Sequence, residues 1–403
     1  MPMDLNGKPF LAFDADNHYY ETIDAFSRHL DKRFRRRGVQ VVQAGDRPMV
    51  LMGEKVSRFI PNPTFDPVLR PGALDPYFRG EIPEGVDPDD LRIVEPIHDE
   101  YRDRDGRLEQ MDAQGLAAIL LFPTMGCGVE QALRADVPAM VATVKAFNRW
   151  LEEDWGFAYE GRIFAAPIIS FADVEEALHE IDYALERQVR VVCVRPAPVP
   201  GENGQPARSL GDPAHDRIWA KLAEAGVPVA FHLSDSGYTG ISAMWGGPAD
   251  FDPFHIDPFT KLVISDRAIH DTIGSLIVHG VFNRHPTLKI ASIENGAQWV
   301  PLLKNRLKKL ANQQPKHFTF DPVAQLVEHV WVAPYFEDDA AELAEHIGVE
   351  RVLFGSDWPH GEGLAEPTDY TKELGGFDDA GVARVMRDNV LDLLGMTAAD
   401  IPS

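Results

Sequence analysis

Short runs of apolar and β-branched residues recur along the chain, and stretches with the spacing of amphipathic helices separate them. The runs cover residues 10–18, 116–123, 162–170, 190–197, 227–234, 288–295, 329–336 and 351–358. Strands that alternate with helices predict an α/β protein with a parallel sheet. Eight strands favour a (β/α)8 TIM barrel, although a doubly wound open sheet would show the same alternation.

The segments between the runs support this organisation. Residues 173–187 and 215–226 have helical periodicity, and the second stretch ends at a glycine, a common helix stop. No internal repeat, low-complexity tract or Pro-, Gly- or Ser-rich linker divides the chain. We therefore predict one domain over residues 1–403, with a helical tail over 363–403.

Two segments interrupt the alternation. Residues 21–100, after the first strand, contain a basic patch and a predicted hairpin over 41–56, and they suggest an insertion over one mouth of the barrel. Residues 234–259, after the fifth strand, are rich in glycine, proline and aromatic residues. Loops of this length are usually functional or mobile, so we expect a substrate lid in preference to plain irregular structure.

Composition and charge restrict the possible partners. The 403 residues are 44% hydrophobic, enough for a large core, and 39 basic against 63 acidic residues give a formal charge of −24. Such an acidic chain is a poor nucleic-acid binder, so we expect a small-molecule substrate and leave a homo-oligomer open. The chain has two cysteines, and it shows no apolar leader and no apolar run of about 20 residues. These features predict a cytoplasmic protein without a membrane span.

Potential metal ligands lie where several predicted strands end. In a parallel barrel the carboxyl ends of the strands share one face, and spacing by two residues places side chains on the same side of a strand. The residues concerned are Asp14, Asp16, His18, His232, Glu294 and Asp357. Mixed imidazole and carboxylate donors suit Zn²⁺, Fe²⁺ or Mn²⁺. A single histidine here would more often be a core residue, and "GSDWPHGEG" alone could be a turn, but the convergence favours a metal site.

The stretches "DADNH", "FHLS", "IENG" and "LFGSDWPH" occur in this order at these strands. Together with "MDAQGLAAILLFPT", "FNRWLEED", "HGVFNRHPTLKI" and "APYFEDD", they resemble the amidohydrolase superfamily, in the branch that includes aminocarboxymuconate semialdehyde decarboxylase. The resemblance covers essentially the whole chain. It implies a metal held by Asp16, His18, His232 and Asp357.

The chain departs from that family pattern at three positions. Asp16 stands where a histidine is usual, which makes the site harder and more anionic and leaves the metal open. Glu294 stands where the sixth strand often carries histidine, so it could bind a second ion or act as a general base. No lysine ends the fourth strand, and the bridging lysine of many two-metal members has no counterpart. One ion is therefore expected, with two if Glu294 is a ligand.

The expected chemistry follows from such an ion, which lowers the pKa of bound water to about 7 in favourable sites. The resemblance implies that Asp357 accepts and passes on a proton. His360 or His279 could polarise a carbonyl, although packing is the commoner role for either. Arg195 could bind a substrate carboxylate or pair with a neighbouring acid.

Two reactions fit these residues. We favour hydrolysis of an amide, ester, lactone or thioester, because Asp16 and Glu294 move the chain away from the semialdehyde decarboxylase pattern. The alternative is metal-dependent, non-oxidative decarboxylation of an aromatic or unsaturated acid. A barrel with a vestigial metal site used only for binding is disfavoured by the nearly complete ligand set. The aromatic residues of the expected lid suggest a bulky apolar substrate: Trp245, Phe251, Phe254 and Phe259. We predict that Trp245 and Trp358 contact the substrate.

Overall fold

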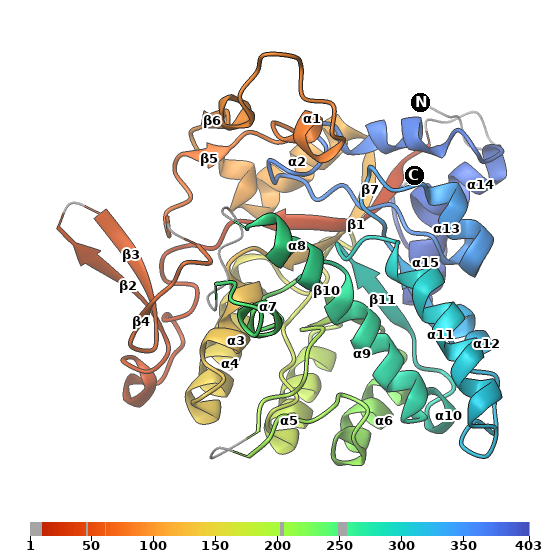
Figure 1. Cartoon of the computed structure of the whole chain (residues 1–403). Helices are drawn as coiled ribbons and strands as arrows, with labels where there is room; N and C mark the ends of the chain where they lie inside the picture. Colours follow the sequence, from red (N-terminus) through yellow and green to blue (C-terminus); the bar gives the residue numbers. More distant parts are fainter. Residues whose placement is uncertain (1–9, 46, 61, 202–204, 249–255, 403) are drawn as a thin grey trace.

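The protein is a mixed α/β structure with parallel strands at its centre and helices around them (Figure 1). The computed structural model describes residues 10–45, 47–60, 62–201, 205–248 and 256–402. The parallel strands are β1 (Ala12–Tyr19), β7 (Leu116–Pro123), β8 (Ile163–Ala165), β9 (Val192–Val194), β10 (Val229–His232), β11 (Ile290–Ile293) and β12 (Val330–Val332). They correspond to the first seven predicted runs, and all are buried.

The strands form two parallel sheets, one in the order β1-β7-β8 and the other in the order β12-β11-β10-β9. Isolated parallel bridges connect their edges, and these pair Ile168 with Cys193, Val332 with Val352, and Asn17 with Trp358. The strand order therefore follows the chain order, and consecutive strands are neighbours. This arrangement places all the strand carboxyl ends on one face.

The eighth predicted run, 351–358, lies between β12 and β1 but is not a regular strand. Leu353 N donates to Val332 O (2.8 Å), and Asp357 N donates to Asp16 O (2.9 Å). Between them, Ser356 N donates to the Asp14 carboxylate instead of to a strand carbonyl, and Asp357 has a φ of 57°. The side-chain hydrogen bond and the left-handed residue interrupt the ladder, which explains the difference from the prediction.

Helices pack around the strands. The longer ones are α2 (Arg104–Gln114), α4 (Val137–Asp154), α5 (Val174–Leu185), α6 (Asp216–Ala225), α9 (Arg267–Val278), α11 (Trp299–Gln313), α12 (Pro322–His329) and α13 (Ala340–Ile347). Helices α5 and α6 confirm the two predicted helices, and α6 ends at Gly226, whose φ of 67° favours glycine. Shorter helices include α3 (Val129–Ala132) and α10 (Val281–Arg284). Among the described residues, none of the helices is long and apolar enough to cross a membrane.

The C-terminal residues are largely helical, with a 3-10 helix at Pro367–Leu374, α14 at Asp379–Ala383, a π-helix at Arg384–Asp388 and α15 at Asn389–Leu394. These elements lie within the tail predicted over 363–403. Helix α15 and the π-helix pack against β1.

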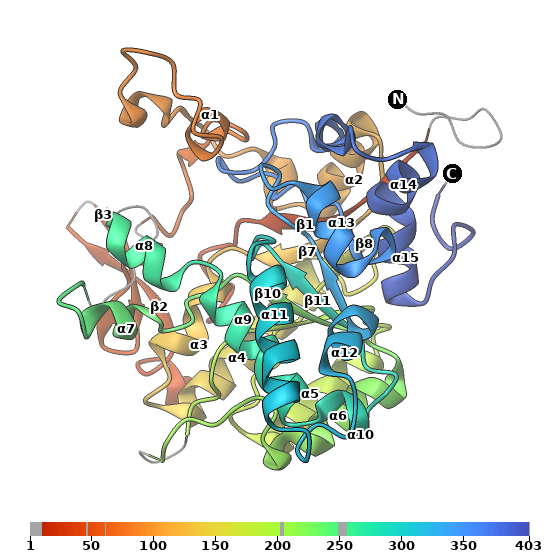
Figure 2. The same cartoon turned by 45° about the vertical axis from the view of Figure 1, so that its right-hand side comes forward.

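The segment after β1 contains the predicted hairpin. Strands β2 (Val39–Ala44), β3 (Arg47–Met52) and β4 (Lys55–Val56) form an antiparallel sheet, which projects from the body in Figures 1 and 2. The same segment forms β5 (Val68–Leu69), β6 (Val94–Glu95) and α1 (Asp75–Phe78). Leu74 N donates to Gly361 O (2.8 Å), so this part of the segment is fastened to the chain just after Asp357.

The link after β10 is partly helical. Helix α7 spans Thr239–Ala243, and α8 spans Pro258–Ile264. The Trp245 side chain is 76% exposed, and its ring lies 6.4 Å from the Phe259 ring between centroids. Phe251 and Phe254 lie outside the described residues.

A buried arginine fastens the end of β1 to the segment before α2. The Arg107 guanidinium donates to Glu100 O (2.8 Å), Asn17 Oδ1 (2.5 Å) and His18 O (2.8 Å). It also lies 4.6 Å from the centre of the Trp358 ring, within range of a cation–π interaction. Burial lowers the pKa of Arg107 to about 9, which leaves it charged at neutral pH.

We expect Arg107→Met to destabilise the fold by about 3 kcal/mol or more, because it leaves buried carbonyl groups without donors. Urea unfolding followed by circular dichroism measures the loss. The matched control is Arg33→Ala, since the Arg33 side chain is 74% exposed. Equal unfolding midpoints for the two variants would contradict the structural role of Arg107.

Candidate metal centre

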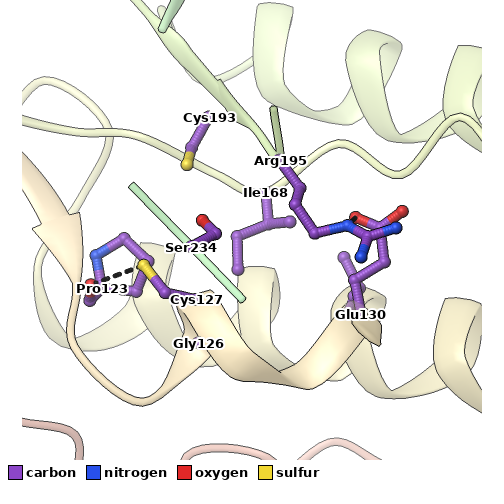
Figure 3. Close-up of a pocket in the computed structure, with 9 residues that line it drawn as sticks. Pro123, Gly126, Cys127, Glu130, Ile168, Cys193, Arg195 and Ser234 are labelled. Atoms are coloured by element: carbon purple, nitrogen blue, oxygen red, sulfur yellow. Dashed lines mark hydrogen bonds and ion pairs between the residues drawn. The ribbon is translucent and has the colours of Figure 1, made fainter. Parts of the chain in front are cut away.

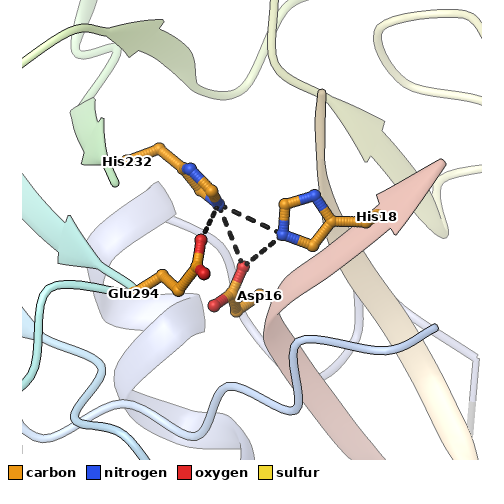
Figure 4. A group of neighbouring side chains, drawn as sticks. All are labelled: Asp16, His18, His232 and Glu294. Atoms are coloured by element: carbon orange, nitrogen blue, oxygen red, sulfur yellow. Dashed lines mark hydrogen bonds and ion pairs between the residues drawn. The ribbon is translucent and has the colours of Figure 1, made fainter. Parts of the chain in front are cut away.

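Four potential metal ligands converge at the carboxyl ends of three strands (Figure 4). Asp16 and His18 lie two positions apart on β1, His232 is the last residue of β10, and Glu294 directly follows β11. One ligand atom from each of the four lies within 4.8 Å of the others. Strands far apart in sequence thus bring together the residues that the pattern of strand ends predicts.

The ligand atoms face one another closely. His18 Nε2 and His232 Nε2 are 3.2 Å apart, and Asp16 Oδ1 lies 3.3 Å from the first and 3.4 Å from the second. Glu294 Oε2 is 3.4 Å from His232 Nε2. The group therefore presents two imidazole nitrogens and two carboxylate oxygens to a common point.

The backbone orients His232 as a ligand. Its Nδ1 lies 2.9 Å from Leu233 O, and a carbonyl oxygen can only accept a hydrogen bond. Nδ1 therefore carries the proton, and in the neutral ring the Nε2 lone pair faces the cluster. Metal-bound histidines are typically held in this way.

The electrostatics of the cluster fit a cation. Asp16 Oδ1 is buried and has no hydrogen-bond partner. Burial, followed by the negative charges of Asp357 and Asp16, raises the pKa of Glu294 well above its usual range. Burying carboxylates together is costly unless positive charge compensates. A divalent ion would supply that charge, and the mixed oxygen and nitrogen donors suit one. The cluster is thus suitable for a divalent metal ion.

A second group adjoins the first through His18. His18 Nε2 lies 3.3 Å from Asp357 Oδ1, and the same oxygen lies 2.7 Å from His360 Nδ1. The three residues form a second potential ligand group. Burial, followed by the charges of Glu362 and Asp16, raises the pKa of Asp357 well above its usual range. Asp357 and His360 therefore form a buried acid–base pair beside the four ligands.

Two of these acids have unusual backbones. Glu294 has a φ of 58° and Asp357 a φ of 57°, in the left-handed region that residues with a Cβ rarely adopt. Each such conformation costs roughly 1 kcal/mol or more and persists where the surroundings hold it. This conformation turns Glu294 towards the cluster directly after β11, and Asp357 towards it within the irregular segment 351–358.

The Asp14 carboxylate holds the backbone next to Asp357 in place. It accepts hydrogen bonds from Asp16 N (3.1 Å), Asn17 Nδ2 (2.9 Å), Ser356 N (3.0 Å) and Ser356 Oγ (2.5 Å). Asp14 thus faces the junction of β1 with the 351–358 segment, away from the four ligands. The sequence places Asp14 among the residues at the predicted strand ends. Nothing in it indicates that Asp14 anchors the segment 351–358 to β1.

Arg195 lies at the end of β9, beside a small cavity of about 10 Å³ that can hold one water molecule (Figure 3). Its guanidinium donates to Gln131 Oε1 (2.8 Å) and Pro198 O (3.0 Å), and its Nε lies 3.8 Å from Glu130 Oε2. The predicted alternatives were a substrate carboxylate or a neighbouring acid. The structure places an acid next to Arg195.

Three further candidate residues lie away from the ligand cluster. His279 is exposed after the end of α9, and its Nδ1 lies 3.1 Å from Ser209 Oγ. The buried Trp358 ring packs against Arg107 and against Tyr101 (5.2 Å between centroids). Trp245 is mostly exposed, as described above. The structure therefore brings together Asp16, His18, His232, Glu294, Asp357 and His360, but not these three.

A sequence model described as "Amidohydrolase" matches residues 87–396. The chain belongs to the amidohydrolase family. A crystal structure of an amidohydrolase from Mycobacterium avium subsp. paratuberculosis shares 56% identity with a TM-score of 0.92, covering 96% of this chain and 99% of that chain. None of the curated proteins matches the chain. The family assignment agrees with the sequence resemblance and with the TIM-barrel class of fold.

More distant structures share the family fold. A dihydroxybenzoic acid decarboxylase from Polaromonas with bound manganese has 18% identity and a TM-score of 0.60, covering 81% of this chain and 94% of that chain. A 5-carboxyvanillate decarboxylase from Sphingomonas paucimobilis has 15% identity and a TM-score of 0.60, covering 96% and 99%. At these identities the likeness shows a shared fold.

We expect Mn²⁺ added to chelator-treated protein to raise the melting temperature, because an ion that binds only the folded state stabilises it. The gain is about 2.7 kcal/mol at 100 times Kd. His232→Ala removes a converging nitrogen and should abolish most of the shift. His279→Ala, outside the cluster, should keep it. Differential scanning calorimetry measures both, and a full shift in His232→Ala would place the ion elsewhere.

Proposed function

We propose that the protein is a metal-dependent, non-oxidative decarboxylase of an aromatic or unsaturated acid. The observation that carries the proposal is the adjacency of two groups. One is the converging set Asp16, His18, His232 and Glu294, and the other is the acid–base pair Asp357–His360, only 3.3 Å from His18 Nε2. The neighbouring decarboxylases act on substituted benzoates and share the fold, which supports the same class here.

In this proposal Asp16, His18 and His232 hold one divalent ion, with Glu294 or Asp357 completing its ligands. Carboxylate oxygens are hard donors, so we propose manganese before zinc or iron. When bound, the ion supplies positive charge that attracts the substrate's carboxylate and stabilises negative charge developing on it. Asp357 and His360 hold the proton that the substrate carbon needs when CO₂ leaves.

The surrounding architecture belongs to the same proposal. We infer that the segment 351–358 completes an eight-stranded barrel between β12 and β1 within a single domain. The described parts of the segment 21–100 and of the link 234–259 cover its mouth and shape a site for a small molecule. The hydrogen bond from Leu74 to Gly361 supports this for the first segment.

Hydrolysis is the second candidate, and Glu294 is the observation that favours it. Its carboxylate faces the cluster, and its side chain is 16% exposed, so solvent can reach it. A carboxylate in this position suits a general base that takes a proton from water. Esters, amides, lactones and thioesters would then be the substrates.

We expect manganese-loaded protein to release CO₂ from at least one of 2,6-dihydroxybenzoate and 5-carboxyvanillate. The comparison assay is release of p-nitrophenol from p-nitrophenyl acetate and of thiol from an acyl thioester. Liquid chromatography and a coupled CO₂ assay follow the products. Hydrolysis of an ester or thioester without CO₂ release from any acid would select the second candidate.

We expect Asp357→Asn to lower kcat by a factor of about 10² to 10⁴, because it keeps the shape but removes the group that holds the proton. Glu294→Gln separates its two roles. As a ligand, its loss lowers metal content per chain, measured by plasma emission spectroscopy. As a base, its loss lowers turnover while the metal stays. Near-normal turnover of Asp357→Asn would end the decarboxylase proposal, in which Asp357 holds the proton.

A further inference from the structure

Thr124, immediately after β7, contacts the side of His360 that faces away from Asp357. Thr124 Oγ1 lies 2.9 Å from His360 Nε2 and also donates a hydrogen bond to Tyr19 O (2.8 Å). The other ring nitrogen, Nδ1, lies 2.7 Å from Asp357 Oδ1. A chain of hydrogen bonds therefore runs from the end of β1 through Thr124 and His360 to Asp357.

The direction of these hydrogen bonds follows from counting protons. A threonine hydroxyl has one hydrogen, and the Tyr19 carbonyl oxygen can only accept. The hydroxyl hydrogen therefore points to Tyr19 O, and Thr124 Oγ1 accepts from His360. His360 Nε2 must carry a proton, whatever the state of the rest of the ring.

The ring of His360 is also fixed in orientation. It lies 4.0 Å from the His18 ring and 5.7 Å from the Tyr20 ring between centroids. Its side chain is 12% exposed. The two ring contacts and the partners at both nitrogens restrict the orientation of the ring.

We propose that Thr124 is a positioning residue that holds the His360 ring with Nε2 directed at the Thr124 hydroxyl and Nδ1 directed at Asp357. The 2.7 Å contact between Nδ1 and Asp357 Oδ1 then has a fixed geometry. Without Thr124, the neutral ring could place its proton on Nδ1 and expose an unprotonated Nε2. The pair would then lose its fixed geometry.

The fate of the proton held by the pair rests on the proposed function. In decarboxylation the C–C bond to the substrate carboxylate breaks, CO₂ leaves, and the electron pair stays on the substrate carbon. That carbon forms a C–H bond with the proton held by the pair, and solvent then returns one proton to the pair. No oxidant or reductant is consumed.

The decisive variants are Thr124→Val, which removes the hydroxyl at nearly constant shape, and Thr124→Ser, which keeps it. Thr143→Val is the matched control, because Thr143 is buried in α4 and donates to Ala139 O (2.7 Å). We expect Thr124→Val to lower kcat about 10- to 100-fold on whichever acid is turned over, with KM and metal content unchanged. Thr124→Ser and Thr143→Val should stay within about threefold of the original protein.

Nuclear magnetic resonance of ¹⁵N-histidine protein loaded with diamagnetic Zn²⁺ tests the same inference without turnover. The Nε2–H signal of His360, assigned by its loss in His360→Gln, should be protected from exchange and should disappear in Thr124→Val. A signal unchanged in Thr124→Val, or a Ser variant as slow as the Val variant, overturns the role of Thr124. A panel without any CO₂ release overturns only the proposed function, because the signal still reports on His360.

Discussion

The site depends on the free energy of holding carboxylates and imidazoles together out of water. Asp16, His18 and His232 are almost fully buried, and Glu294 is nearly so. Removing each charge from water costs several kcal/mol, and only a compensating charge or well-placed donors offset that. The Asp16 oxygen that faces the cluster has the His18 and His232 rings as its nearest partners, at 3.3 and 3.4 Å. The arrangement of the surrounding backbone is best understood as support for a site that binds a cation.

That support comes from polar groups beneath the ligands. Asp14 connects β1 to the segment 351–358, and Arg107 connects the end of β1 to the chain before α2. Both side chains are fully buried. They form hydrogen bonds with backbone, amide and hydroxyl groups close to the ligands. The ligand positions are thus defined by backbone that is itself held on two sides. Hydrogen bonds that fix the backbone and side chains around metal ligands usually determine how precisely a metal is held.

Much of the site could be predicted from the sequence because strand ends are visible in it. Apolar runs that stop at Asp16, His18, His232 and Glu294 indicate the shared face, since parallel strands end together. The irregular last run could not be predicted, because the Ser356–Asp14 hydrogen bond joins positions 342 residues apart. His279 and Trp245 were chosen for their residue type, and type does not tell where a helix end or a loop side chain points. Thr124 was overlooked because a threonine after a strand is common.

One residue, His18, belongs to both polar groups. Its Nε2 lies 3.3 Å from Asp16 and equally far from Asp357, and its ring lies against the His360 ring. A change at this position therefore alters the four-ligand cluster and the surroundings of the Asp357–His360 pair at once. Natural variation cannot adjust one group without the other through His18. Variation that adjusts only one of the two groups has to fall on residues other than this shared imidazole.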